Sequence, residues 1–119
     1  MTTEQIALRL KELCDQGQFE HALKELFSSD AVSIEPHETP DFAQETKGLD
    51  AILAKGKKWS EMVTEQHGFE ISGPLIANDS FALTMHIDVT MKGGKRMNHK
   101  ELCVYQISGG KIVSEEFFM

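Results

Sequence analysis

The stretch SFALTMHIDVTMKGGKRMNHKELCVYQISGGKIVSEEFFM, residues 80–119, decides the fold class of this chain. Its apolar and polar residues alternate in three segments, which are separated by Gly93-Gly94 and Gly109-Gly110. Alternation predicts strands with two different faces, and Gly-Gly pairs are typical of hairpin turns. The preceding segment HGFEISGPLIAND, residues 67–79, predicts another strand, with a bulge at Gly73-Pro74 and an Asn-Asp turn at its end. We therefore predict an antiparallel meander of four strands.

The residues before this meander predict helices. Apolar residues recur at the spacing of a helix face over about residues 3–15, 19–27 and 49–63. Between the second and the third helix, AVSIE (residues 31–35) is predicted to be a strand and HETPDFAQETKG (residues 37–48) a loop. Three helices followed by an antiparallel sheet predict a single α+β domain over residues 1–119, with the helices on one face of the sheet.

The overall charge disfavours two classes of partner. The formal net charge is −7, and the one local cluster of cations, Lys55, Lys57 and Lys58, is interpreted as a solvated helix face. Nucleic acids and anionic membrane surfaces bind clustered Lys and Arg, so we expect neither as a partner. The sequence has neither the pattern of a signal peptide nor the roughly 20 apolar residues of a membrane span. We therefore expect a cytoplasmic protein.

Three further segments carry a resemblance to a known family. They are ELFSSDAVSIEP (25–36), KGLDAI (47–52) and VYQISGGKIVSEEFF (104–118). Together they resemble the NTF2-like superfamily and, within it, the SnoaL-like proteins, over nearly the whole chain. The resemblance implies a cystatin-like fold, in which three N-terminal helices pack on a strongly curved, mainly antiparallel sheet that forms a cone with an internal pocket. It does not fix a function, since the superfamily includes isomerases, cyclases, hydrolases, dehydratases and binding modules.

The register of the central hairpin predicts what its two faces carry. If Gly93-Gly94 is a two-residue turn, the opposed pairs on one face are Asp88/His99, His86/Glu101, Thr84/Cys103 and Ala82/Tyr105. The other face is then an apolar strip of Leu83, Met85, Ile87, Val89, Leu102 and Val104. We expect the polar face to line the pocket and the apolar strip to be buried in a homodimer. A register slip of one residue would reverse this assignment.

The resemblance adds residues to the predicted pocket. Glu35 matches the carboxylate that moves the proton in ketosteroid isomerases. Leu10 and Cys103 stand where those isomerases hold the developing oxyanion, which argues against steroid isomerisation in that form. The full set of predicted ligand-binding residues is Trp59, His67, Phe69, Thr84, Asp88, His99, Cys103, Glu115 and Phe117. The predicted catalytic residues are Glu35, His86 and Glu101.

Each of these residues also has a structural interpretation. Glu35 could be a strand-end carboxylate in water, and His86 with Glu101 could be a structural ion pair. The segment HID, with His86, Asp88 and Glu101 opposite, resembles the Asp-Arg-Asp arrangement of epoxide hydrolases of this superfamily, but His lacks the permanent charge of Arg. Cys103 is expected to be a packed thiol rather than a nucleophile. The aromatic residues could equally be core.

A metal site is not expected. His67, His86 and His99 could share a face with Asp88 and Glu101, but no HxH or HxxxH element brings two imidazoles together. Cys14 has no ligand spacing to Cys103, and both are predicted to be free thiols. We expect no cofactor.

These observations predict a domain that binds a small, partly polar organic molecule in a pocket with an apolar end and a His/Glu end. Two alternatives stay open. One is an enzyme of the isomerase, cyclase or hydrolase type that uses Glu35, or His86 with Glu101, as acid and base. The other is a non-catalytic dimerisation scaffold whose pocket is filled by side chains.

Overall fold

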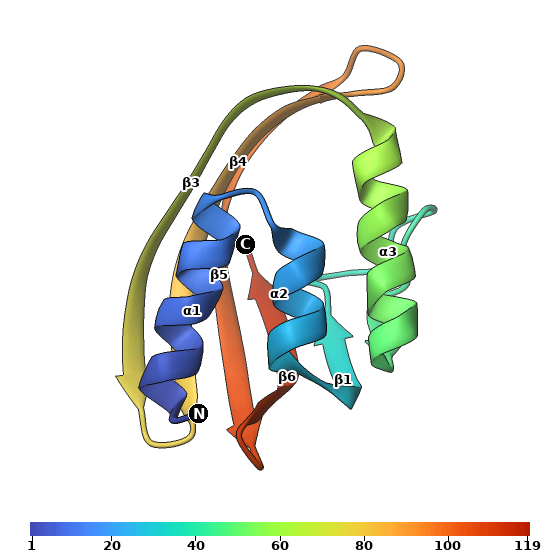
Figure 1. Cartoon of the computed structure of the whole chain (residues 1–119). Helices are drawn as coiled ribbons and strands as arrows, with labels where there is room; N and C mark the ends of the chain where they lie inside the picture. The colour runs from blue at the N-terminus through green and yellow to red at the C-terminus, as the bar shows by residue number, and fades with distance from the viewer.

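A computed structural model describes all 119 residues as three helices and one sheet of six strands. The helices are α1 (Thr3–Asp15), α2 (Phe19–Leu26) and α3 (Leu49–Met62). The strands are β1 (Phe27–Ile34), β2 (Glu45–Lys47), β3 (Val63–Ala77), β4 (Ser80–Met91), β5 (Arg96–Ser108) and β6 (Lys111–Phe118) (Figure 1). The predicted α+β class is confirmed. None of the three helices is long and apolar enough to cross a membrane.

The first helix begins where the sequence supplies a cap. The Thr2 hydroxyl accepts a hydrogen bond from the Gln5 amide at 3.1 Å, and the Gln5 side chain accepts one from the Thr2 amide at 2.9 Å. This reciprocal capping box satisfies amides that the helix itself leaves free. The buried stripe of α1, with Ile6, Leu10 and Leu13, then packs against the sheet.

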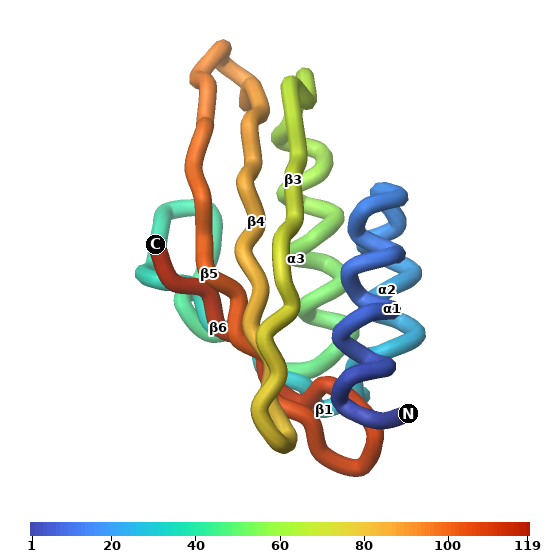
Figure 2. Tube along the Cα trace, turned by 90° about the vertical axis from the view of Figure 1, so that its left-hand side faces the viewer, coloured from blue at the N-terminus to red at the C-terminus, as the bar shows by residue number.

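The six strands lie in the order β2-β1-β6-β5-β4-β3. The predicted meander β3-β4-β5-β6 is confirmed and is antiparallel throughout. Two features were not predicted: β2 is a short strand in the segment predicted to be a loop, and β1 pairs with β6 in parallel. The three helices lie on one side of the sheet (Figure 2). We call the side of the sheet that faces the helices the inner face.

Two strands begin earlier than predicted. Strand β1 includes the polar residues Ser28, Ser29 and Asp30, which lie where the register between β1 and β6 shifts. An irregular strand leaves such residues unpaired and in contact with water. Their polarity is therefore compatible with a strand and does not mark a break before it. Strand β3 begins at Val63, directly after the last residue of α3, and Val63 pairs with Met91.

The register of the β4–β5 hairpin differs from the prediction by one residue. The Met91 amide donates to the Lys95 carbonyl at 2.7 Å, so Lys92, Gly93 and Gly94 form a three-residue loop. Both glycines have positive φ angles, 92° and 87°, which glycine adopts without strain. With one more loop residue, Met85 opposes Glu101, Ile87 opposes His99 and Leu83 opposes Cys103. The predicted pairs Asp88/His99, His86/Glu101, Thr84/Cys103 and Ala82/Tyr105 are wrong.

This register also reverses the predicted apolar strip. Leu83, Met85 and Val89 are buried on the inner face. Leu102 and Val104 oppose Thr84 and Ala82 on the outer face. The strip therefore does not form a surface for a second copy of the chain. Of its β4 residues, Leu83, Met85 and Val89 are core, and Ile87 is partly buried against the core.

The core fills the inner face near the β3–β4 and β5–β6 turns. Tyr105 is buried there, stacked on Phe81 at 4.8 Å and edge-on to Phe27 at 6.4 Å. The predicted bulge at Gly73-Pro74 is confirmed as a register shift between Ser72 and Leu75. A Cβ on Gly73 would lie 3.2 Å from Leu83 Cβ, so only glycine lets β3 approach β4 this closely. The strong curvature of the sheet and the internal pocket stay predictions.

Candidate functional site

A group of polar side chains gathers on the inner face, where β1, β5 and β6 lie opposite α3. We call this group the polar corner; it consists of Ser33, Glu35, Lys55, Glu101 and Glu115. Strands β1 and β6 bring Ser33 directly beside Glu115, and Glu35 follows one residue after the end of β1. Lys55 reaches the group from the middle of α3.

Hydrogen bonds connect four of these five residues. The Lys55 ammonium donates to Ser33 Oγ at 2.6 Å and to Glu35 Oε2 at 3.1 Å, and the Ser33 hydroxyl donates to Glu115 Oε2 at 2.7 Å. The Lys55 side chain is only 16% exposed, and its ammonium lies 5.8 Å from the centre of the Phe117 ring. An ion pair that is sheltered from water in this way is held more firmly than a surface pair.

Two carboxyl groups of the polar corner hold their protons more tightly than usual. Burial raises the pKa of Glu101 to about 7, and the nearby carboxylates of Glu35 and Glu115 add to this increase while Lys55 opposes it. Burial also raises the pKa of Glu115, although the hydrogen bond from Ser33 and the charge of Lys55 counteract it. The corner therefore holds one group, Glu101, that changes its protonation state near neutral pH.

Glu101 and His99 make no hydrogen bond or ion pair with another side chain. They are alternate residues of β5 and both are half-buried on the inner face. Their opposed neighbours on β4 are apolar, Met85 for Glu101 and Ile87 for His99. Burial lowers the pKa of His99, and the charge of His86 lowers it further. These are polar groups that a ligand could contact.

The surroundings of these two residues are apolar and aromatic. Phe69 opposes Ile87 and meets the Phe19 ring edge-on at 5.3 Å. We call Phe69, Met85 and Ile87 the apolar end. Phe117 opposes Cys103, whose thiol is fully buried and has a raised pKa because of burial and the charge of Glu101. Such a thiol stays protonated. Cys103 thus fits the packed, non-nucleophilic thiol expected from the sequence.

The structure places four predicted site residues away from the polar corner. Thr84, His86 and Asp88 lie on the outer face, because the register is shifted by one residue. There His86 contacts Asn98 Oδ1 at 2.6 Å, and Asp88 accepts two hydrogen bonds from Arg96 at 2.9 and 2.8 Å. His67 Nε2 contacts the Thr90 hydroxyl at 2.6 Å on the same face. The predicted His86/Glu101 pair and the arrangement resembling epoxide hydrolases are therefore not formed.

The three histidines weighed as metal ligands are also separated, since His99 lies on the inner face and His67 and His86 do not. No group of three or more His, Cys, Asp or Glu side chains is arranged to hold a metal ion. Both cysteines are free. Trp59 lies on α3 and packs against Phe42 of the preceding loop, with ring centres 6.4 Å apart.

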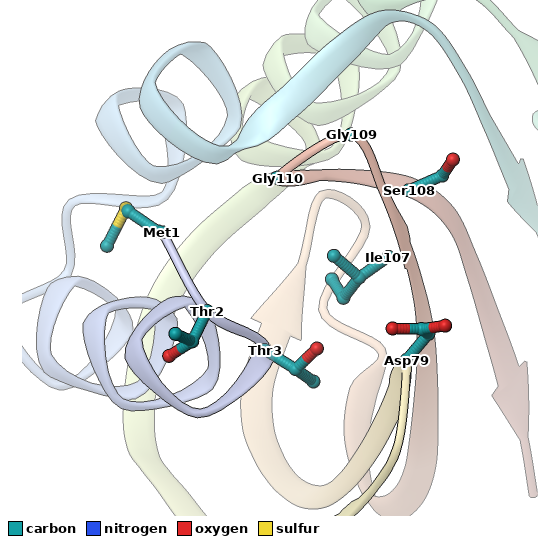
Figure 3. A pocket seen from close by; sticks show the side chains of 8 residues that line it. All are labelled: Met1, Thr2, Thr3, Asp79, Ile107, Ser108, Gly109 and Gly110. Carbon is teal, nitrogen blue, oxygen red and sulfur yellow. The ribbon is translucent and has the colours of Figure 1, made fainter.

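Two hollows on the surface lie elsewhere. One, of about 450 Å³, is bounded by the start of α1 and by the β3–β4 and β5–β6 turns (Figure 3). Asp79 is the only ionisable side chain that lines it. The other, of about 380 Å³, lies beside the end of α3 and is lined by Lys57, Lys58, Lys92 and Glu61 among others. Neither includes a residue of the polar corner.

A family model described as the SnoaL-like domain matches residues 1–119. The chain belongs to this family. A protein from Mesorhizobium loti, named as a candidate SnoaL-like polyketide cyclase and also with the term carbohydrate phosphatase, is 34% identical; the match covers 100% of both chains, with a TM-score of 0.93. Its two designations name different reactions, so neither one carries over directly to this SnoaL-like domain.

Other similar structures support the fold alone. An NTF2-like protein from Burkholderia thailandensis is 20% identical over 99% of this chain and 90% of its own, with a TM-score of 0.82. A protein from Catenulispora acidiphila with a ketosteroid isomerase-like fold, in complex with trimethylamine, is 17% identical over 84% of this chain and 74% of its own, with a TM-score of 0.67. The resemblance to the NTF2-like superfamily is thereby confirmed. The comparison with curated proteins finds no match.

Two residues of the SnoaL-like domain's polar corner were missed in the sequence. The lysine cluster predicts a solvated face, but Lys55 lies three residues after the buried Ile52 and thus on the inner side of α3. Ser33 alternates with Glu35 along a strand, which should have placed both side chains on one face. Both signals are local, but the charge of the lysine cluster favours a solvated face, and serine is common at exposed positions.

Proposed function

We propose that residues 1–119 form a single SnoaL-like domain that binds a small organic molecule on the inner face, between the polar corner and the apolar end. The observation that carries this proposal is the state of Glu101. It is the one carboxyl group of the corner without a hydrogen-bond partner, and its pKa is raised to about 7. A half-buried carboxyl group loses hydrogen bonds to water, and Glu101 gains no hydrogen bond from the chain in their place. A ligand that supplies a hydrogen bond would therefore be favoured there.

The charge of the corner indicates the kind of polar group that would bind. Lys55 and Glu35 neutralise one another, and Glu115 is hydrogen-bonded to Ser33. Glu101 therefore adds a charge between zero and −1, and no cation is left over for an anionic ligand. We infer that the ligand presents a hydrogen-bond donor or a positive charge to Glu101. The complex of the Catenulispora acidiphila protein with trimethylamine is consistent with this choice.

Three probes with one ring and different head groups test the proposal. We expect cyclohexylamine to bind more tightly at pH 8 than at pH 6, by about ten-fold, since the ionised fraction of Glu101 rises by that factor. Cyclohexanecarboxylate should bind more weakly than cyclohexylamine at pH 8, and cyclohexanol should show little dependence on pH. Affinities would be measured from NMR chemical-shift changes.

Glu101→Gln should remove the dependence on pH. The matched control is Glu116→Gln, because Glu116 opposes Val104 on the outer face of the same sheet. If cyclohexylamine binds with the same pH dependence in Glu101→Gln as in the unchanged protein, the site is elsewhere.

Acid–base catalysis of the isomerase or cyclase type is a second candidate. A carboxyl group with a pKa near 7 can both take and give a proton at neutral pH. The Glu35 carboxylate is held in an ion pair with Lys55, whereas Glu101 has no partner in the chain, so this candidate favours Glu101 over Glu35. Exchange of the α-protons of cyclohexanone in D2O, followed by NMR, tests it without a known substrate. We expect exchange above the buffer rate that Glu101→Gln abolishes and Glu35→Gln preserves.

We further propose that this domain forms a homodimer through the outer face, in the cytoplasm. Leu102 and Phe118 oppose each other there and are 43% and 46% exposed. Val104 lies next to them on the same face. An apolar patch of this kind is covered without further residues when two copies associate about a twofold axis. This patch replaces the apolar strip expected from the sequence.

A further inference from the structure

We infer that the ligand is bifunctional, with one polar group held by Glu101 and a second, uncharged polar group held by His99. This inference rests on the proposed function, because it assumes that the ligand contacts Glu101. It goes further by adding His99 as a second contact and by naming a chemical class, small amino alcohols or amino ketones with a compact carbon frame.

The first support is the position of the two side chains. Glu101 and His99 are two residues apart on β5, which separates them by about 7 Å along the strand. Their opposed residues, Met85 and Ile87, pack into or against the core on the inner face, so Glu101 and His99 point to that face as well. A molecule of one ring or of four to five carbons would span this separation.

The second support is the absence of partners for both side chains. Three other histidines, His21, His67 and His86, each contact a side chain of the protein within 3.0 Å. His99 contacts none, although it is half-buried, and the same is true of Glu101. A half-buried polar group without a partner carries a desolvation cost, and a bound ligand can remove that cost at both positions at once.

The third support is the chemistry of the two groups. The groups around Glu101 are Glu35, Glu115 and Lys55, and the one charged group acting on His99 is His86 on the far side of the sheet. Burial favours the neutral imidazole, which has one donor and one acceptor nitrogen and so suits a hydroxyl or carbonyl group. The carboxylate of Glu101 suits an ammonium. The side chains of Met85, Ile87 and Phe69 between and beside them suit a carbon frame.

Two probes that differ by one hydroxyl group test this inference at pH 8. Cyclohexylamine can contact only Glu101, whereas trans-4-aminocyclohexanol carries a hydroxyl group across the ring that can reach His99. We expect the amino alcohol to bind about five-fold more tightly, the effect of one ordinary hydrogen bond. In His99→Leu the two probes should bind equally, and cyclohexylamine should keep its affinity. In the matched control His86→Leu, on the outer face, the five-fold preference should remain.

The outcomes separate this inference from the proposed function. If cyclohexylamine binds in the expected way but the hydroxyl group adds nothing, the bifunctional ligand is overturned while the proposed function stands. The same conclusion follows if His99→Leu keeps the preference. If neither probe binds the unchanged protein, both the proposed function and the bifunctional ligand are overturned. Unfolding curves of the variants show whether a lost effect reflects lost folding.

Discussion

The ammonium of Lys55 lies 3.1 Å from Glu35 and 2.6 Å from the hydroxyl of Ser33, so it serves two strand residues from one helix position. This arrangement assigns different roles to the three carboxyl groups around it. Glu35 is ion-paired, Glu115 is buried and hydrogen-bonded, and Glu101 is left without a partner.

Glu101→Gln should make stability less dependent on pH. Burial raises the pKa of Glu101 from its ordinary value of 4.5 to about 7 in the folded chain. The folded state therefore binds more protons than the unfolded state between these values, and stability falls as the pH rises from about 4.5 to 7. The cost to the unchanged protein above pH 7 is up to about 3 kcal/mol. The free energy of unfolding in urea should therefore differ less between pH 5 and pH 8 in Glu101→Gln than in the unchanged protein.

Part of the decrease of stability with rising pH should remain in Glu101→Gln, because the raised pKa of Glu115 acts in the same direction. An equal slope in the variant and the unchanged protein would mean that Glu101 titrates normally. NMR titration of the carboxyl carbons gives the same answer independently.

Lys55→Met should destabilise the protein at pH 8 by about 2 kcal/mol, because it leaves the carboxylates of the polar corner without their cation. It should also raise the pKa of Glu101 and of Glu115 further, since Lys55 lowers both. Lys57→Met is the matched control on the exposed side of the same helix. Equal unfolding free energies for the two variants in urea would mean that Lys55 does not stabilise the polar corner.

Ser33→Ala should cost about 1 to 2 kcal/mol of unfolding free energy, since it leaves the buried carboxyl group of Glu115 without its donor. The pKa of Glu115 should rise as well, because the hydrogen bond from Ser33 favours the ionised form. Ser29→Ala, at an exposed position of the same strand, is the control. Carboxyl-carbon NMR measures the pKa, and chemical unfolding measures the free energy. If neither quantity changes in Ser33→Ala, the hydrogen bond between Ser33 and Glu115 is contradicted.

Gly73→Ala should destabilise the sheet by about 2 kcal/mol or more. Gly73 has a φ angle of +107°, and the added Cβ would lie 3.2 Å from Leu83 Cβ and 3.3 Å from the Ala82 carbonyl. Gly68→Ala on the same strand is the control, because its Cβ would meet no atom within 4 Å. Thermal unfolding should show a clear decrease in melting temperature for Gly73→Ala and little change for the control.

Leu102→Glu should yield a monomer if the outer face forms the homodimer. A charge opposite Phe118 would be buried without a partner in the interface. Sedimentation of the unchanged protein at micromolar concentration should show twice the mass of the chain. A monomeric unchanged protein would rule out this assembly.

The helices and the meander could be predicted because their signals are local. Helical spacing around Ile6, Leu10 and Leu13, and the Gly-Gly turns, depend on neighbouring residues only. The parallel pairing of β1 with β6 could not be predicted in this way, since it joins segments from opposite halves of the chain.

The site was predicted in part for a similar reason. Glu35, Glu101, Glu115 and the aromatic residues were selected from the sequence, but their grouping depended on the length of one turn. A loop of three residues rather than two placed His86 and Asp88 on the outer face and left His99 beside Glu101. A Gly-Gly pair is compatible with both lengths, so the sequence alone did not distinguish them.

The pairing of Ser33 with Glu115 has a consequence for how the protein is made. These residues are 82 positions apart, and β6 is the last strand to leave the ribosome. Until β6 inserts between β1 and β5, Glu115 is hydrated and Lys55 lacks part of its environment. The pKa of Glu101 is then not yet raised in full, because Glu101 is less buried and the charge of Glu115 is not yet nearby. Contacts of such long sequence separation also form slowly. The polar corner is therefore complete only once β6 has paired with both of its neighbouring strands.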